Sequence, residues 1–329
     1  MEGDNSTVRF NNPVSEYMYN TYNGKGAHPD VYIPALILFS SMLIGYVGNT
    51  LVILATWKNK TLHGSCNFFL SLCCLGDILH QSAHWPYAYL TLSGQNFMSY
   101  KHCLWFQTIP MIGLNLSICM TLFVGFDRLI SVLFPTSYRR INVKAYIAIC
   151  LLVVFGINCY FIYLPYAAKD MENAQVMCII LDGMGGGAAE QWFLVCVLVN
   201  IADLIIYTAV WILIRFRAGT SESTKRIFRS LQVIMFSVVG GWLVNAFVMG
   251  VIVPAIKVPV NNIYYFQAYF GFLPNFASAA NFIPLYIFSY EYRITFQQIL
   301  APIFPCIKVQ KLQQVTTVEQ SKSAISMHG

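Results

Sequence analysis

The chain has 329 residues, of which 57% are hydrophobic and 10% are charged, with a formal net charge of +6. Soluble proteins carry charged side chains at roughly a quarter of their positions, so this composition excludes a soluble globular fold of this size. The apolar residues gather in long runs separated by short polar segments, which is the pattern of membrane-spanning segments.

Seven apolar runs follow a polar stretch of thirty residues, in which we expect no cleavable signal peptide. Each run reaches the roughly 20 residues that a helix needs to cross the hydrocarbon core. The predicted fold is therefore an all-α membrane protein, a seven-transmembrane helix bundle with a short amphipathic helix after the seventh span. The runs are Val31–Trp57, Ser65–Leu90, Cys103–Phe134, Ala145–Ala167, Gln191–Phe216, Ile227–Ile256 and Ile263–Phe288.

The lysine and arginine residues set the expected orientation, because cytoplasmic loops are enriched in them. One face of the bundle would carry 15 of the 20, and the other would carry 5. We therefore expect a plasma-membrane protein with its N-terminus outside and its C-terminus inside. We interpret the basic loops as topology signals beside anionic membrane lipid, not as nucleic-acid sites. The expected parts are an extracellular tail (1–30), the bundle (31–288), an amphipathic cytoplasmic helix (289–301) and a cytoplasmic tail (302–329).

Four residues at the ends of the spans or outside them are candidates for covalent modification. Asn5 begins an Asn-Ser-Thr sequon on the expected outer side and is a candidate glycosylation site. Cys103 and Cys178 would both face an oxidising compartment, so we predict a disulfide between them, with two unpaired thiols as the alternative. Cys306 would lie near the inner membrane surface and is a candidate for palmitoylation, with an unmodified cysteine as the alternative.

Asp127 and Arg128 form a charge pair at the end of the third run, where ionisable residues call for a functional explanation. Arg128 follows Cys103 by 25 residues, which corresponds to roughly 37 Å of helix. That length exceeds the hydrocarbon core of ~30 Å, so we expect Arg128 at the cytoplasmic surface. A simple interfacial charge pair is the alternative.

These features together resemble the rhodopsin-like (class A) G-protein-coupled receptors from about Val31 to Leu300. Leu129 stands where that family usually has tyrosine, and Phe282 stands for the proline after Asn281. The combination resembles the nematode serpentine chemosensory receptors of the srsx class. The matching residues are Gly48-Asn49, Asp77, Cys103 with Cys178, Asp127-Arg128, and Pro135 with Tyr138, together with the segments Leu62–Asn67, Gly76–His80 and Gly125–Val132.

The resemblance implies a chemosensory receptor, with sensory cilia as one expected location, that binds an extracellular ligand and activates a heterotrimeric G protein. Arg128 would offer its donors to the G protein when released from Asp127. The usual acidic partner from the sixth span is not evident at Thr224, although Glu222 is near, so we expect Asp127 alone to restrain Arg128. The implied coupling residues are Asp127, Arg128, Pro135, Tyr138 and Tyr207.

The resemblance also implies a polar centre around Asp77 with Ser117, Asn281 and Asn49. A sodium ion could occupy it, and the alternative is a protonated Asp77 bonded to Asn49 and Asn281. No other cofactor is expected. Asp203, in the fifth span, has no explanation from the sequence.

The ligand, a small molecule or a peptide, is expected in the outer half of the bundle. The third span has no acid there, which disfavours amine ligands, and the seventh span has no lysine, which excludes a retinal Schiff base. The candidate contacts are Gln107, Met111, Trp192, Trp242, Asn245, Gln267, Tyr269 and Phe270.

Three other functions compete with this interpretation. A neuropeptide-type receptor would share the fold. A secondary transporter would show paired internal repeats, and we find none. An enzyme would need clustered metal-ligating or catalytic residues, but the six histidines are scattered. Only His80 and His84 have helical spacing, which we interpret as a polar helix face.

Overall fold

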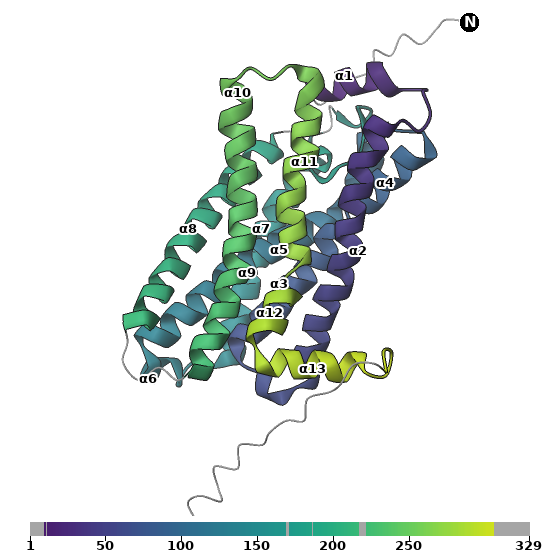
Figure 1. The fold of residues 1–329 in the computed structure, drawn as a ribbon. Coiled ribbons are helices and arrows are strands. Elements are labelled where there is room, and N and C mark those ends of the chain that lie inside the picture. Colours follow the sequence, from purple (N-terminus) through teal and green to yellow (C-terminus); the bar gives the residue numbers. More distant parts are fainter. Residues whose placement is uncertain (1–9, 11, 169–170, 186, 217–221, 306–329) are drawn as a thin grey trace, which may run out of the picture.

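The computed structural model describes residues 10, 12–168, 171–185, 187–216 and 222–305. These residues form a bundle of long helices packed side by side (Figure 1), which confirms the predicted all-α membrane fold. The candidate sites at Asn5 and Cys306, and the tail from 306 onward, lie outside the described residues.

Five stretches of helix within the described residues are long and apolar enough to cross a membrane. They coincide with the first, third, fourth, fifth and sixth apolar runs. The sixth-run helix passes through a π-helical turn, Val248–Ile252, before its last residues. The stretches are α2 (Pro29–Lys58), α5 (Tyr100–Leu133), α7 (Val143–Ala167), α8 (Ala188–Phe216), and Arg229–Ala255, which covers most of α9 (Glu222–Phe247) and all of α10 (Val253–Ala255).

The second and seventh runs are each two helices, which corrects the expectation of continuous spans. The second run forms α3 (Ser65–Gln81) and α4 (His84–Ser93), and the seventh forms α11 (Val260–Ala279) and α12 (Phe282–Phe288). Each break lies four residues before a proline, at Ser82 before Pro86 and at Ala280 before Pro284. Proline lacks an N–H and its ring clashes with the carbonyl four residues earlier, so it interrupts the helix at that point.

The two ends of the bundle carry different elements (Figure 1). One end carries α1 (Pro13–Tyr22), α4 and a short antiparallel pair of strands, β1 (Met98–Ser99) and β2 (Gln175–Val176). We call it the disulfide end, because the Cys103–Cys178 disulfide also lies there. The segment expected to be a tail thus contains a helix, whose first turn is capped by Asn12.

The other end, which we call the arginine end, carries Arg128, α6 (Pro135–Tyr138), the short 3₁₀-helix η1 (Lys60–Leu62) and α13 (Tyr290–Leu300). The last of these helices occupies the segment expected to be amphipathic, and Ser289 caps it through the backbone N–H of Tyr292.

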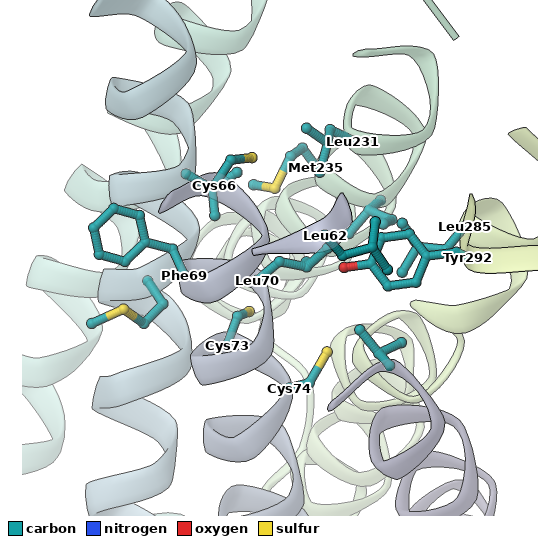
Figure 2. Packing of buried hydrophobic residues seen from close by; sticks show 14 of the residues in the cluster. Leu62, Cys66, Phe69, Leu70, Cys73, Cys74, Leu231, Met235, Leu285 and Tyr292 are labelled. Carbon is teal, nitrogen blue, oxygen red and sulfur yellow. The ribbon is translucent and has the colours of Figure 1, made fainter. Parts of the chain in front are cut away.

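A large apolar cluster packs the helices together near the arginine end (Figure 2). Cys66, Cys73 and Cys74 of α3 are buried in it as small apolar side chains. Tyr292 of α13 reaches into the cluster, and its hydroxyl lies 2.9 Å from Thr56 Oγ1 on α2. Because lipid is as apolar as these side chains, close packing holds such a cluster together. It holds α3 beside α5 and the start of α13 beside α2.

Candidate functional site

The charge pair on α5 is enclosed by two hydroxyl groups at the arginine end. Asp127 is fully buried, and Arg128 forms an ion pair with it and donates from Nε to Oδ2 at 3.0 Å. Ser65, at the start of α3, donates to Asp127 Oδ1 at 2.7 Å. The Tyr138 hydroxyl lies 3.0 and 3.1 Å from the two carboxylate oxygens. The carboxylate is therefore held from α3 and α6 as well as by Arg128.

Tyr138 also accepts a hydrogen bond from Arg128 Nη2 at 3.1 Å. The expectation that Asp127 alone restrains Arg128 is therefore wrong. Pro135 begins the short helix α6 and so places Tyr138 one turn later against α5. The sequence could not show this contact, because it depends on how the loop folds back. The side chains of Glu222 and Thr224 lie outside the described residues.

Tyr207 of α8 lies one turn further into the bundle and bonds to the backbone of α5. Its hydroxyl donates to the Thr121 carbonyl at 3.0 Å. The close approach depends on Gly125, where a Cβ would lie 2.9 Å from the Tyr207 ring. In this structure Tyr207 therefore bridges α8 and α5.

Asp77 forms the centre of a second polar group, in the middle of the bundle. Its two oxygens accept hydrogen bonds from Ser117 Oγ at 2.5 Å and from Asn281 Nδ2 at 2.9 Å. Gly76 permits this approach of α3 to α5, because a Cβ there would lie 2.6 Å from the Ser117 backbone N. Asn49 does not bond to Asp77: it donates to the Ser278 carbonyl at 3.3 Å.

A small cavity of about 10 Å³ lies beside Asp77. Asp203 of α8 also lines it, is 2% exposed, and has one carboxylate oxygen without a hydrogen-bond partner among the described residues. A space of this size holds about one water molecule or one small ion. Ser117, Thr121 and Asn200 add oxygen atoms to the lining, whereas Asn49 and Asn281 do not line it.

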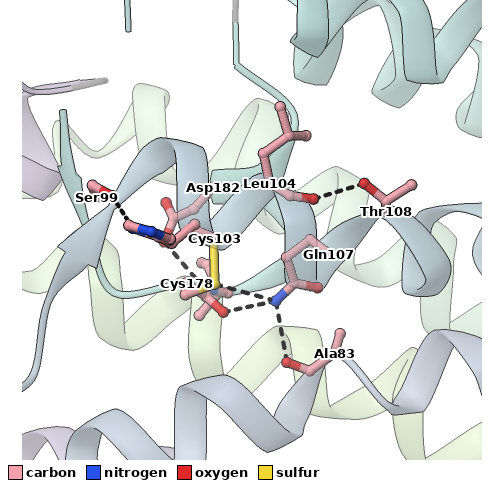
Figure 3. Close-up of a disulfide and its surroundings, with 10 residues drawn as sticks. Ala83, Ser99, Cys103, Leu104, Gln107, Thr108, Cys178 and Asp182 are labelled. Atoms are coloured by element: carbon pink, nitrogen blue, oxygen red, sulfur yellow. Dashed lines mark hydrogen bonds between the residues drawn. A yellow bond between two sulfur atoms is a disulfide. The ribbon is translucent and has the colours of Figure 1, made fainter. Parts of the chain in front are cut away.

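The predicted disulfide between Cys103 and Cys178 is present and ties the loop before α8 to the start of α5 (Figure 3). Gln107 reinforces the connection, since its Nε2 donates to the Cys178 carbonyl at 2.8 Å and to the Ala83 carbonyl at 3.2 Å. The loop then forms the 3₁₀-helix η3 (Ile180–Gly183). Burial raises the pKa of Asp182 in this helix to about 6, although backbone N–H groups that bond to it act in the opposite direction.

Beneath this loop lies a cavity of about 360 Å³, within the size range of small-molecule sites. Helices α2, α3, α4, α5, α8, α9 and α11 contribute to its walls, and Ile179, Ile180 and Leu181 cover it. Most of the lining is apolar. Glu190, at the rim, is the one charged residue among the described residues that line it. The cavity therefore suits a small, largely apolar molecule.

Four of the eight predicted ligand contacts line this cavity: Trp192, Trp242, Asn245 and Gln267. Trp192 and Trp242 meet edge to face, with ring centroids 5.6 Å apart. The other four lie elsewhere. Gln107 supports the disulfide loop, Met111 is buried in an apolar cluster, Tyr269 is 48% exposed, and Phe270 stacks on Phe266.

Sequence reasoning missed several residues that line the cavity, above all His80 and His84. Both are buried, and His84 Nε2 lies 3.0 Å from Asn275 Oδ1. His80 lines the ligand cavity and also the small cavity beside Asp77. Their spacing of four residues within an apolar run is the signal in the sequence, and the structure shows both side chains buried at the cavity and not on a polar helix face.

Comparison with protein families gives one match over most of the chain. The family described as "Serpentine type 7TM GPCR chemoreceptor Srsx" matches residues 42–300. This range begins within α2 and ends with α13, so it contains the arginine network, the Asp77 centre and every residue that lines the cavity except Leu38.

Two curated relatives match a shorter stretch of 132 residues. The chain is 28% identical to the adenosine receptor A2a of Canis lupus familiaris and 29% identical to that of Cavia porcellus. The stretch is 39% of this chain and 31% and 32% of those receptors, so the match spans about a third of their length.

Proposed function

The chain belongs to the serpentine Srsx family of seven-transmembrane chemoreceptors, and on that premise we propose that it binds a small apolar ligand at its disulfide end and activates a heterotrimeric G protein at its arginine end. Members of this family are receptors and not enzymes. The observation that carries the proposal is that one helix, α5, contributes Leu114 to the wall of a largely apolar cavity and carries, further along, the buried carboxylate that holds an arginine.

The proposed orientation puts the disulfide end outside the plasma membrane and the arginine end in the cytoplasm. The excess of lysine and arginine near the arginine end supports it. The disulfide supports it as well, because such bonds persist in oxidising compartments.

At the cytoplasmic face, Arg128 is the group that would meet the G protein. Its guanidinium keeps its charge and offers planar donors that suit carbonyl or carboxylate partners. At rest those donors are directed to Asp127 and Tyr138. Activation would release them, and Tyr207 beside Gly125 would move with α8 as the bundle opens.

In the core, the oxygen atoms around Asp77 fit a single small cation such as sodium. Asp77, Ser117, Thr121 and Asn200 would hold it, and it would supply positive charge to two buried carboxylates. This set shares Asp77 and Ser117 with the residues first expected, and replaces Asn49 and Asn281, which bond elsewhere or lie outside the cavity.

The size of the cavity favours a small ligand over a peptide, and this observation supports the chemosensory role over the neuropeptide alternative. The first experiment is a screen of small apolar compounds in cells that express the receptor with a promiscuous G protein.

The Arg128→Ala variant tests the coupling role. We expect normal surface expression and ligand binding, but no ligand-stimulated GTPγS binding. Lys101→Ala, an exposed cation at the disulfide end, is the control and should signal normally. Intact signalling in Arg128→Ala contradicts the proposal.

A further inference from the structure

Two buried histidines lie at the deep end of the ligand cavity, where α3 ends and α4 begins. His80 is 3% exposed and His84 is 6% exposed, and both line the cavity. His80 also lines the small cavity beside Asp77, so this end of the ligand cavity is directed toward the middle of the bundle. No described carboxylate forms an ion pair with either ring. A charged ring without a partner would be costly at this depth, so we treat both rings as neutral.

Asn275 of α11 determines which nitrogen of His84 carries the proton. Asn275 Nδ2 donates to the Gly271 carbonyl at 2.8 Å, which fixes the orientation of the amide group. Asn275 Oδ1 is an acceptor and lies 3.0 Å from His84 Nε2, so Nε2 must carry the hydrogen. In a neutral imidazole the other nitrogen, Nδ1, is then an acceptor. His84 Nδ1 bonds to no described residue, and it is not one of the buried polar atoms that the protein closes off. His84 therefore presents an unused acceptor to the cavity.

His80 supplies a donor beside this acceptor. A neutral imidazole has one N–H, and neither ring nitrogen of His80 bonds to a described residue. The His80 and His84 ring centroids lie 6.4 Å apart, with the ring planes inclined by 59°. A hydrogen bond to oxygen spans ~2.8 Å, so there is room for one oxygen atom between the rings. An oxygen in this place has to donate to His84 and accept from His80.

A hydroxyl group meets both demands through a single uncharged atom, because it donates one hydrogen bond and accepts others. A ketone, an ester or an ether only accepts, so it would leave His84 Nδ1 without a partner, which costs free energy. An ammonium or a carboxylate group would need an opposite charge at this depth. No described residue at the deep end offers one, since Glu190 lies at the rim.

We propose that the ligand is an apolar alcohol or phenol that enters hydroxyl first, donates to His84 Nδ1 and accepts from His80. Its skeleton would lie against the apolar lining of the cavity. Gln267 precedes Asn275 by eight residues on α11, which places it roughly 12 Å nearer the disulfide end, too far to bind the same hydroxyl. The inference rests on the proposed ligand site, but it does not depend on the G protein.

The test measures binding by thermal stabilisation of the full chain in phosphatidylcholine nanodiscs, without a G protein. The probes are menthol, borneol and thymol, each compared with its own methyl ether. Menthol and borneol are also compared with their ketones, menthone and camphor. We expect each hydroxyl compound to bind roughly fivefold more tightly than its ether or ketone, the factor that corresponds to one hydrogen bond.

His84→Gln separates the two nitrogens of the ring. Glutamine Nε2 can still donate to Asn275, but the acceptor in the position of Nδ1 is lost. The variant should bind the hydroxyl compounds roughly fivefold more weakly and the ethers and ketones as the wild type does. His102→Gln, the same substitution at an exposed histidine of α5 that bonds to Ser99, is the matched control and should leave every affinity unchanged.

Equal binding of alcohols and ketones by the wild type would overturn the inference and would mean that a water molecule stays between the histidines. So would the absence of stabilisation by every hydroxyl compound, or a preference for them that persists in His84→Gln. If that variant does not fold, the comparison of compounds on the wild type decides alone. Hydroxyl compounds that bind without stimulating GTPγS binding would instead contradict the proposed coupling. Ketones or ethers that bind as tightly and signal would contradict this inference and leave the proposed function standing.

Discussion

Two hydroxyl groups from separate elements meet one buried carboxylate at the arginine end. Ser65 Oγ and the Tyr138 hydroxyl lie 2.7 Å apart, and both contact Asp127. A carboxylate out of water needs such donors, because an unpaired charge there is costly. With them in place the buried carboxylate has donors from α3 and α6, and it also binds Arg128.

Ser65→Ala and Tyr138→Phe should each weaken the hold on Arg128 and raise ligand-independent nucleotide exchange. Each loses about 1 kcal/mol of hydrogen bonding, so a rise of roughly fivefold is expected. The measurement is basal GTPγS binding at matched surface expression.

The double variant distinguishes a shared network from independent contacts. Because the two hydroxyls touch each other, their effects should not be additive. Ser131→Ala, whose hydroxyl bonds only to the Arg128 carbonyl among the recorded contacts, serves as the control. Basal exchange unchanged in both single variants would show that the two hydroxyl groups do not help to hold Arg128.

At the scale of elements, α5 is joined to its neighbours by a chain of polar side chains as well as by packing. Asn115 Nδ2 donates to Asn158 Oδ1 of α7 at 3.1 Å, and Asn115 Oδ1 accepts from Trp192 Nε1 of α8 at 2.9 Å. Asn158 lines a hollow of about 600 Å³ between α5 and α7, and Trp192 lines the ligand cavity. Asn115 is therefore hydrogen-bonded to one lining residue of each of these two sites.

Asn115→Leu should destabilise the bundle, because it leaves the indole N–H of Trp192 and the side-chain oxygen Oδ1 of Asn158 buried without their Asn115 partner. Each such loss costs about 1–3 kcal/mol, so we expect a drop of several degrees in the melting temperature of the detergent-solubilised receptor. Asn115→Leu combined with Asn158→Leu should recover part of the loss, since one of the two orphaned groups is then gone. A double variant less stable than the single one would show that the pair contributes through packing alone.

At the scale of the whole molecule, the sequence predicts the membrane spans because hydropathy reports directly on the solvent around a helix. It does not predict which side chains meet across helices. Asn49 bonds to Ser278 and not to Asp77, and Gln107 supports a loop, because these contacts depend on how two helices are rotated against each other. The helix breaks at Ser82 and Ala280 could be predicted from the sequence, because Pro86 and Pro284 indicate them.

The helix α1 was harder to predict from the sequence. Ten residues in a polar stretch do not form a stable helix alone, so tertiary contacts must hold it. Tyr22, at its end, supplies one such contact through its hydroxyl, 3.0 Å from that of Tyr265 on α11.

The cover over the ligand cavity gives the molecule a dependence on pH that can be measured. Asp182 lies in η3, is 8% exposed, and accepts a hydrogen bond from the Ile179 N–H at 3.1 Å. Burial raises its pKa from 3.8 to about 6, so the folded state binds a proton more tightly than the unfolded state. The resulting stabilisation is complete below about pH 4 and is lost as the pH rises through about 6, and its full size is about 3 kcal/mol.

Asp182→Asn keeps the acceptor for Ile179 but removes the charge. We therefore expect the variant to melt at a higher temperature than the wild type at pH 7.5, and the difference to shrink toward pH 5 as the wild-type carboxyl takes up its proton. Thermal unfolding of both proteins across this range is the measurement. Glu172→Gln, an exposed acid of the same loop that pairs with Lys101, is the control and should follow the wild-type curve. A difference that stays constant from pH 5 to 7.5 would show that Asp182 is solvated in solution, and the cover over the cavity would then have to be more open than it is in this structure.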